Sequence, residues 1–237
     1  LTTLDKNVYA LEVKGTFDDC QKLVKNAFLD NELKSHMNLS SANSINIARL
    51  IPQSFYYFNA FSKLYANKSP LVVSVPSGNF GNLTAGILAK YMGLPIKKFI
   101  ASTNANRTVS DYLISGKYTP YPTISTVSNA MDVGDPSNMK RIMNLYADID
   151  QLRKDLKSWS FSDKETMKTI TSVLHDYNYL LDPHSAVGLL GLLKYVDSNP
   201  RVSGLFLGTA HPSKFSDIIE PEIKQKINIP KRLKEII

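Results

Sequence analysis

Residues 71–101 read LVVSVPSGNFGNLTAGILAKYMGLPIKKFIA, and this stretch decides the fold. Its first five residues indicate a buried strand, and the glycine-rich residues 76–82 indicate a turn. Apolar residues then recur at helical spacing over residues 83–92, until a glycine and a proline end the helix. A second strand begins at residue 96. Because strand, helix and strand follow in this order, the sequence predicts an α/β fold with a parallel, helix-covered sheet.

The sequence before this stretch predicts a strand and two helices. A strand over residues 8–13 precedes a helix that a capping box at residues 16–19 would begin, with Cys20 packed in a core. Residues 45–65 show a second helical pattern, in which Pro52 should kink or restart the helix. The predicted core-facing side of this helix comprises Ile47, Ile51, Phe55, Phe58 and either Phe61 or Ser62.

The sequence after this stretch continues the alternation. Residues 103–137 are rich in Ser, Thr, Asn, Pro and Gly, and they predict irregular structure with short helices. Helical patterns follow near residues 137–157, 163–176 and 183–196, and a last strand is predicted over residues 204–208. This order again favours an α/β protein.

Composition and charge limit the possible partners. The 237 residues suffice for one large domain or two modest ones, and 43% hydrophobic residues are typical of a soluble globular protein. The net charge is +7, but the basic residues are scattered, without a basic stripe, zinc-finger spacing or RNA-binding signature. No nucleic-acid partner is therefore expected, and the charge is consistent with a phosphorylated ligand.

Two further absences bear on location. No apolar stretch approaches the roughly 20 residues of a membrane span, so no membrane partner is expected. The single cysteine cannot form an internal disulfide, which fits a reducing compartment and predicts a cytoplasmic protein. The four histidines show no metal-ligand spacing, so no metal site is expected.

The turn at residues 77–82, Ser-Gly-Asn-Phe-Gly-Asn, is the first candidate binding site. Glycines let the backbone approach a ligand closely, and the N-terminus of the following helix offers free amides and a partial positive charge. This combination can bind a phosphate without a lysine. The spacing fits neither a Walker loop nor a Gly-x-Gly-x-x-Gly turn. A tight turn that only caps the helix is the alternative.

A second polar cluster lies at the predicted start of the helix over residues 45–65. Its hydroxyls, amides and guanidinium could chelate an anion through charge-assisted hydrogen bonds. Helix capping combined with a surface arginine is the alternative. The cluster comprises Ser41, Asn43, Ser44, Asn46 and Arg49.

Two other positions follow from the predicted elements. Thr209 and His211 come directly after the last strand, at the edge where open α/β sheets bind ligands, although a loop with satisfied side chains is the alternative. His184 stands at a predicted helix start, where a capping or structural role is expected.

These stretches together resemble threonine synthase, a family of pyridoxal-phosphate enzymes of the tryptophan-synthase-β fold type. The matching motifs occur in the family's order and span nearly the whole chain, so coincidence is a poor explanation. They are residues 15–20 (GTFDDC), 41–46 (SANSIN) with Arg49, 76–82 (PSGNFGN), 104–106 (NAN), 128–134 (SNAMDVG), 136–138 (PSN), 182–188 (DPHSAVG) and 209–212 (TAHP).

The resemblance implies an activity, a cofactor and site residues. Members of this family convert O-phospho-L-homoserine and water into L-threonine and phosphate, with pyridoxal 5'-phosphate as cofactor. The Thr209 hydroxyl would meet the pyridine nitrogen, and the 41–49 cluster would bind the substrate phosphate, with Arg49 as its charge-matched member. Residues 1–66 would be the remaining part of a smaller domain, and residues 67–237 most of a larger cofactor-binding domain. The cofactor phosphate would be held by Gly78, Asn79, Phe80, Gly81 and Asn82.

One feature of the family is missing from the sequence. The family's Schiff-base lysine lies in a Phe-Lys-Asp stretch that a Ser-Gly-Asp-Thr-Gly-type loop follows, and neither occurs in these 237 residues. Because that lysine anchors the cofactor and carries protons, no catalytic residue is assigned. We expect the C-terminal portion of a longer enzyme, truncated at the N-terminus, inactive alone and prone to self-association through open strand edges. A threonine-synthase-like phospholyase and a non-catalytic phosphate-ligand module are the alternatives.

Overall fold

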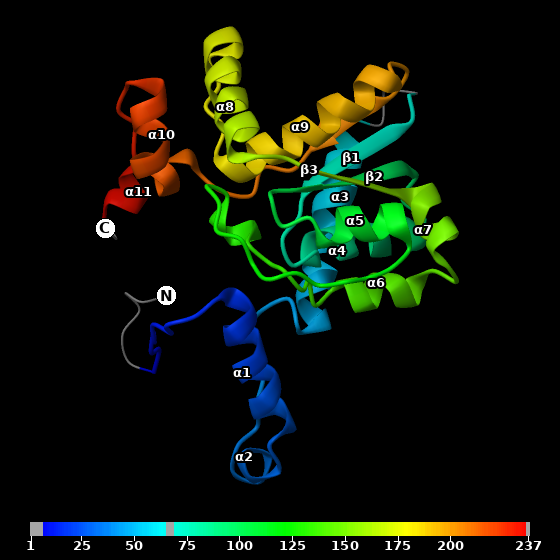
Figure 1. The fold of residues 1–237 in the computed structure, drawn as a ribbon, viewed down its shortest axis with the longest axis vertical. Helices are drawn as coiled ribbons and strands as arrows, with labels where there is room; N and C mark the ends of the chain where they lie inside the picture. Colours follow the sequence, from blue (N-terminus) through cyan, green and yellow to red (C-terminus); the bar gives the residue numbers. More distant parts are fainter. Residues whose placement is uncertain (1–6, 65–68, 236–237) are drawn as a thin grey trace.

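The described part of the chain, residues 7–64 and 69–235 of a computed structural model, contains a sheet of four parallel strands (Figure 1). Val73 of the central strand β1 pairs with Phe99 on one side and Leu205 on the other. The predicted parallel α/β fold is confirmed. In spatial order the strands are β3 (Leu156–Ser160), β2 (Ile96–Thr103), β1 (Leu71–Pro76) and β4 (Ser203–Phe206).

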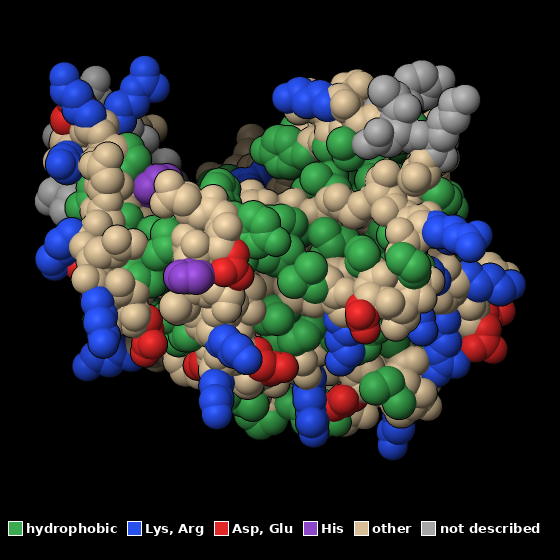
Figure 2. Space-filling model, turned by 90° about the horizontal axis from the view of Figure 1, so that it is seen from above, with side chains coloured by type: hydrophobic (Ala, Val, Ile, Leu, Met, Phe, Trp, Pro, Cys, Tyr) green, Lys and Arg blue, Asp and Glu red, His purple; other side chains and the backbone are tan. Residues whose placement is uncertain are grey.

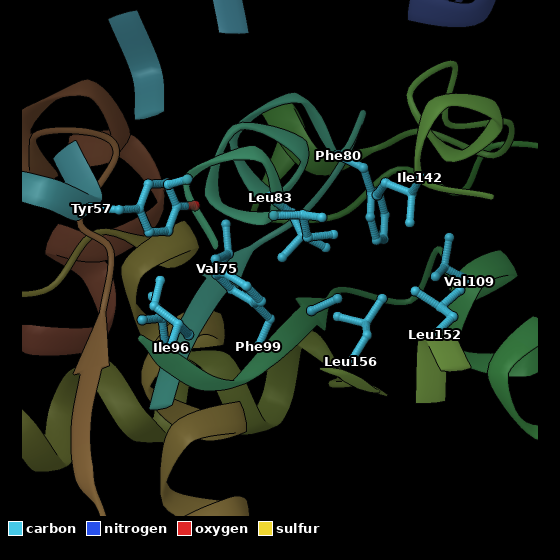
Figure 3. Close-up of a cluster of buried hydrophobic side chains, with 14 of the residues drawn as sticks. Tyr57, Val75, Phe80, Leu83, Ile96, Phe99, Val109, Ile142, Leu152 and Leu156 are labelled. Carbon is cyan, nitrogen blue, oxygen red and sulfur yellow. The ribbon is translucent and has the colours of Figure 1, made fainter. Parts of the chain in front are cut away.

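Successive side chains of the strands face two helical layers, because strand residues alternate between the two faces of a sheet. Val73 and Phe99 pack in the larger core together with helices α3 to α7 (Figure 3). Val72 and Ile100 point to the opposite face, where they pack against Leu192 of α9. Burial on both faces explains the nearly continuous apolar sequence of β1. The helices are α3 (Leu50–Leu64), α4 (Gly81–Tyr91), α5 (Thr108–Ser115), α6 (Met139–Leu145) and α7 (Ile149–Asp155) on one face, and α9 (Pro183–Ser198), flanked by α8 (Asp163–Tyr177), on the other.

β3 is the strand that the sequence analysis missed. Residues 156–160 read LKSWS, and they directly follow α7 at the end of the predicted 137–157 helix. They pair in parallel with β2, in register with residues 99–103. A short edge strand of mixed polarity gives no alternating pattern of its own, so its pairing with β2 makes it a strand.

The two helices α1 (Phe17–Leu29) and α2 (Asn31–His36) extend away from the sheet (Figure 1). The capping box is confirmed, since Thr16 Oγ1 accepts from the Asp19 amide over 3.3 Å and the Asp19 carboxylate accepts from the Thr16 amide over 2.8 Å. Two expectations are wrong: residues 8–13 form no strand, and Cys20 is half-buried instead of packed in a core. Both expectations required apolar partners to cover these residues. Within the described chain, the residue that α1 buries is the polar Gln21.

Pro52 marks the start of a helix. A 3-10 turn, η1 (Ile47–Arg49), leads directly into α3 at Leu50. Pro52 therefore lies in the first turn of α3, where its missing amide has no intrahelical acceptor to lose. The helix thus restarts near the proline, as one of the two expectations had it.

The apolar face predicted for α3 is wrong except at Phe61, which packs against the larger core. Ile51 and Phe55 are 58% and 60% exposed, whereas Leu50 and Tyr57 are buried. Packing against α4 decides the orientation, because Gly86 of that helix leaves room for the Tyr57 ring. A Cβ at Gly86 would lie 2.5 Å from the Tyr57 ring. Helical spacing alone fits either face, since aromatic and aliphatic residues occur on both.

The chain ends in short helices beside α8 and α9. Phe215 and Ile219 are buried there with Ile170 and Ala186. On the face seen from above, Lys and Arg side chains are spread around the rim, and hydrophobic side chains show between them near the centre (Figure 2). Across the residues described, no helix combines the length and apolarity that crossing a membrane requires. The elements are η3 (Pro212–Phe215), α10 (Ser216–Ile223) and α11 (Lys231–Lys234).

Candidate phosphate-binding site

The glycine-rich turn joins β1 to α4 at the carboxyl edge of the sheet. The Ser77 amide donates to the Ser102 carbonyl over 2.9 Å, which continues the β1–β2 ladder into the turn. Phe80, the N-cap of α4, has a φ of 62°. This left-handed conformation disfavours a non-glycine residue by roughly 1–2 kcal/mol. Its buried ring packs in the core and offsets that strain, so the main chain of Phe80 is the part left for a ligand (Figure 3).

Gly78 and Gly81 bring the turn against two other segments. A Cβ at Gly78 would lie 2.6 Å from Met131 Cα and 3.1 Å from the Ala130 carbonyl oxygen. A Cβ at Gly81 would lie 2.9 Å from Ser44 Cβ. Contacts this short require glycine unless the main chain moves. The turn is therefore fitted between Ser44 and the 3-10 turn η2 (Asn129–Met131).

Helix α4 begins at this turn. The helix is 11 residues long, and no side chain caps it at Phe80. The first amides of a helix have no intrahelical acceptor, and the helix dipole adds a partial positive charge to them. Phosphate groups bind at such helix starts. The two glycines and the uncapped helix thus fit a phosphate group that is held by main-chain amides.

The Asn79 side chain fixes the shape of the turn. Its Nδ2 donates to Ser44 Oγ over 2.6 Å, and its Oδ1 accepts from the Ser137 amide over 2.7 Å and from the Ser137 hydroxyl over 2.9 Å. The Asn138 side chain donates to the Asn79 carbonyl over 2.9 Å. Both ends of the Asn79 amide group are therefore occupied by protein partners, which makes its side chain a brace of the turn.

Asn82 is held from the opposite side. The Tyr57 hydroxyl lies 2.9 Å from both the carbonyl oxygen and Oδ1 of Asn82. Burial raises the pKa of Tyr57 above its ordinary value, so the hydroxyl stays protonated and donates. This contact ties the first turn of α4 to α3.

The 41–49 cluster lies beside the turn and bonds mostly within itself. Ser41 Oγ donates to Asn43 Oδ1 over 2.9 Å, and the Asn46 side chain caps η1. Arg49 is exposed and donates to a carbonyl of the same loop. Within the described structure, Ser44 is the member that a hydrogen bond ties to the glycine turn, through Asn79. The structure thus brings together Ser44 and the turn, whereas the other four side chains make local contacts.

Three residues that hold the turn in place were not predicted as site residues from the sequence. Ser137 and Asn138 hold Asn79 in place, and both belong to the motif at residues 136–138. That motif was the sequence signal that could have identified them. Arg141 donates to the Ser44 carbonyl over 2.8 Å and to Asn138 Oδ1 over 2.6 Å. No sequence pattern around Arg141 distinguishes it from a surface arginine, because Ser44, its partner in the 41–49 cluster, lies 97 positions away.

Thr209 lies at the same edge of the sheet as the turn. β4 pairs with β1 in parallel, with Phe206 opposite Ser74, so the residues after both strands emerge side by side. Thr209 is exposed. His211 Nδ1 lies 2.7 Å from Ser213 Oγ and accepts from the Ser213 amide over 3.2 Å, which caps η3 and fits the structural alternative for this histidine.

A partly buried polar network holds the loop behind the turn. Asn104 Nδ2 donates to Asp132 Oδ1 and to Thr126 Oγ1, each over 2.8 Å, and Thr126 in turn donates to the Asp132 carboxylate. Burial raises the pKa of Asp132 and outweighs the hydrogen bonds from Thr126 and Asn104, which lower it. A cavity of about 730 Å³ beside the network includes Asn106 and Glu165 in its lining, so it lies at the ends of β2 and β3.

Comparison with known proteins identifies relatives of this chain. No protein-family model matches the chain. The threonine synthase of Buchnera aphidicola subsp. Schizaphis graminum is 49% identical over 98% of this chain and 54% of its own length. The crystal structure of threonine synthase from Escherichia coli has a TM-score of 0.90 at 45% identity and covers 98% of this chain and 54% of its own.

A further solved structure, pyridoxal-phosphate-bound threonine synthase from Brucella melitensis, has a TM-score of 0.84 at 35% identity, with 97% of this chain and 55% of its own covered. The chain spans about half the length of the curated relatives it matches. These similarities confirm the resemblance that the motifs carried. Over nearly its whole length, this chain is a homologue of threonine synthase.

Proposed function

We propose that this chain is part of a threonine synthase and binds pyridoxal 5'-phosphate by its phosphate group at residues 78–82. One observation carries the proposal: the turn that holds Gly78 and Gly81 leads into the N-terminus of α4, which no side chain caps. The first main-chain amides of this helix therefore have no intrahelical acceptor and would serve as donors to a phosphate. A relative of 35% identity was solved with this cofactor bound. The residues present fit the group, because a phosphate needs the donors and partial positive charge that a helix start provides.

The chain's own residues would divide the work of holding the cofactor. The amides around Gly78 and Gly81 bind the phosphate, while Asn79 and Asn82 keep the turn in shape through their protein partners. Thr209, which follows the neighbouring strand β4, would offer a neutral hydroxyl to the pyridine nitrogen. When bound, pyridoxal phosphate withdraws electrons from the substrate and stabilises negative charge on its carbon atoms. A hydroxyl partner adjusts that capacity without the full charge of a carboxylate.

The substrate of the whole enzyme would be O-phospho-L-homoserine, and its products with water L-threonine and phosphate. The 41–49 cluster is our proposed site for the substrate phosphate, with Arg49 as the charge-matched member. The hydrogen bond from Asn79 to Ser44 joins this cluster to the cofactor turn. The proposed binding residues are Ser41, Asn43, Ser44, Asn46 and Arg49.

The proposed organisation assigns residues 1–66 to the remaining part of a smaller domain and residues 67–237 to most of a larger cofactor domain. The turn at residues 78–82 then belongs to the larger domain and the 41–49 cluster to the smaller one. A substrate bound between them would contact both. We also propose a cytoplasmic location, on the single cysteine of the sequence.

A comparison of two ligands tests the cofactor proposal. The purified chain is titrated with pyridoxal phosphate and with pyridoxal, which lacks the phosphate, and binding is followed by fluorescence. Pyridoxal phosphate should bind at least about tenfold more tightly, because charge-assisted hydrogen bonds add roughly 1.5–3 kcal/mol each. Inorganic phosphate should compete. Thr209→Val should weaken both ligands alike, since it removes a contact to the ring. Equal affinity of the wild-type chain for the two ligands would contradict the proposal.

A further inference from the structure

A buried histidine connects the start of α9 to the wall behind the phosphate turn. His184 and Asp182 are almost fully buried, and His184 Nδ1 lies 3.0 Å from Asp182 Oδ1. On the other side of the ring, His184 Nε2 accepts from the Ala130 amide over 3.2 Å. Because a main-chain amide can only donate, Nε2 is unprotonated and the ring proton lies on Nδ1, from which it is donated to Asp182.

Asp182 orients this ring. It is the N-cap of α9 and accepts from the His184 amide over 2.9 Å, from the Ser185 amide over 3.3 Å and from the Ser185 hydroxyl. These bonds and the His184 ring lower the pKa of Asp182 below its ordinary value, although burial acts in the opposite direction. The tilted ring of Phe215, 5.0 Å away between centroids, packs beside the imidazole. The ring is therefore held at both nitrogens and beside Phe215.

The bond to Ala130 reaches the phosphate turn through one residue, because the Ala130 amide meets His184 and the Ala130 carbonyl faces Gly78. Ala130 and Met131 form the wall of the turn, since a Cβ at Gly78 would lie 3.1 Å from the Ala130 carbonyl oxygen and 2.6 Å from Met131 Cα. Met131 also packs in a small buried cluster with Val187 of α9. A movement of the Ala130 peptide therefore changes the space left for Gly78.

From this chain of contacts we infer that His184 is a positioning residue for the phosphate turn: as a neutral acceptor, it fixes the amide of Ala130 and thereby the position of Gly78. The positioning is a property of this chain alone. Its relevance to a cofactor rests on the proposed function. The role exceeds helix capping, which the Asp182 carboxylate already provides for α9.

Two isosteric variants separate positioning from capping. In His184→Gln, the amide oxygen can occupy the place of Nε2 and accept from Ala130. In His184→Asn, the amide can occupy the place of Nδ1 and donate to Asp182, but nothing replaces the acceptor for Ala130. Both variants remove the imidazole and its contact with the Phe215 ring, so a loss that is due only to that ring contact appears in the two alike.

We expect His184→Asn, and not His184→Gln, to raise the exchange rate of the Ala130 amide about tenfold, as the loss of one hydrogen bond of about 1.4 kcal/mol does. Hydrogen exchange resolved by NMR measures this rate in the chain without ligand, and the amide shifts of Gly78 and Gly81 should move in the same variant alone. The affinity for pyridoxal phosphate should fall about tenfold in His184→Asn, and that for pyridoxal should not change. Identical behaviour of the two variants at Gly78 and Gly81 would overturn the inference.

A measurement on the wild-type chain decides the inference even where a variant does not fold. Nitrogen chemical shifts of the imidazole report its tautomer, and protonation of His184 at Nε2 near neutral pH would refute the proposed bond to Ala130. A wild-type chain that binds pyridoxal as tightly as pyridoxal phosphate would refute the cofactor proposal. In that case, the exchange rates and the tautomer still decide whether His184 positions the turn.

Discussion

Substituting Gly78 by alanine tests the phosphate turn most directly. The added methyl group would lie 2.6 Å from Met131 Cα, whereas carbon atoms in ordinary contact are about 3.5 Å apart, so the turn or its wall must shift by roughly 1 Å. Overpacking of this kind destabilises a protein by about 1–3 kcal/mol. A shift of 1 Å also breaks the alignment of amides with a phosphate, and each such bond contributes roughly 1.5–3 kcal/mol. We therefore expect Gly78→Ala to weaken pyridoxal phosphate binding by roughly ten- to a hundredfold.

Fluorescence titration with pyridoxal phosphate and pyridoxal, together with thermal unfolding, separates the two effects. Gly208→Ala is the matched control, because its Cβ would lie 3.5 Å from Ser185 Oγ, an ordinary contact at the same edge of the sheet. The control should bind both ligands as the wild type does. If Gly78→Ala keeps the wild-type preference for pyridoxal phosphate over pyridoxal, amides of this turn do not bind the phosphate, and the reasoning fails.

Three other outcomes are expected. Tyr57→Phe should lower the free energy of unfolding by about 1–3 kcal/mol, because it removes the donor to Asn82, whereas Tyr56→Phe at a position 60% exposed should have little effect; urea unfolding measures both. Acid should destabilise the chain through Asp182: its pKa is depressed below the ordinary 3.8, so its contribution is present above that pH and is lost as the pH falls through the depressed value. Asp182→Asn should flatten this part of the acid unfolding curve and Asp176→Asn, on an exposed helix end, should not. The purified chain should release no phosphate from O-phospho-L-homoserine and form no borohydride-trapped adduct at a unique lysine, and turnover would refute the expected inactivity.

The fold could be predicted where one segment carries its own pattern. Residues 71–101 combine a buried strand, a glycine-rich turn and a helix that a glycine and a proline end, and each signal is local, so the order of elements followed directly. The same method failed for residues 8–13 and for the exposed face of α3. In both cases the outcome depends on partners elsewhere: Tyr57 is buried because Gly86 is small, and no spacing within α3 contains that information.

In the candidate site, too, the local features could be predicted from the sequence and the long-range contacts could not. The glycine turn is visible in the sequence because the close approach of Met131 and Ser44 leaves room only for glycine at positions 78 and 81, and this places two glycines directly after β1. The braces of the turn are less visible, since Arg141 acts across 97 positions on Ser44 and Tyr57 across 25 positions on Asn82. The tautomer of His184 is another such property. The Ala130 amide, 54 positions away in the sequence, and the nearby Asp182 carboxylate together set this tautomer.

The binding donors proposed for the glycine turn belong to the main chain, and this affects how the protein tolerates genetic change. No single side-chain truncation can delete a peptide amide, so a scan that replaces each residue by alanine would register a weak effect at Ser77, whose hydroxyl bonds only within its own segment, and strong effects at the two glycines, where alanine is an enlargement. Ligand binding would therefore be most sensitive to substitutions of the residues that fix the course of the main chain. Bulkier residues near Ala130 are expected to be as damaging as changes in the turn itself, although they would never touch the ligand.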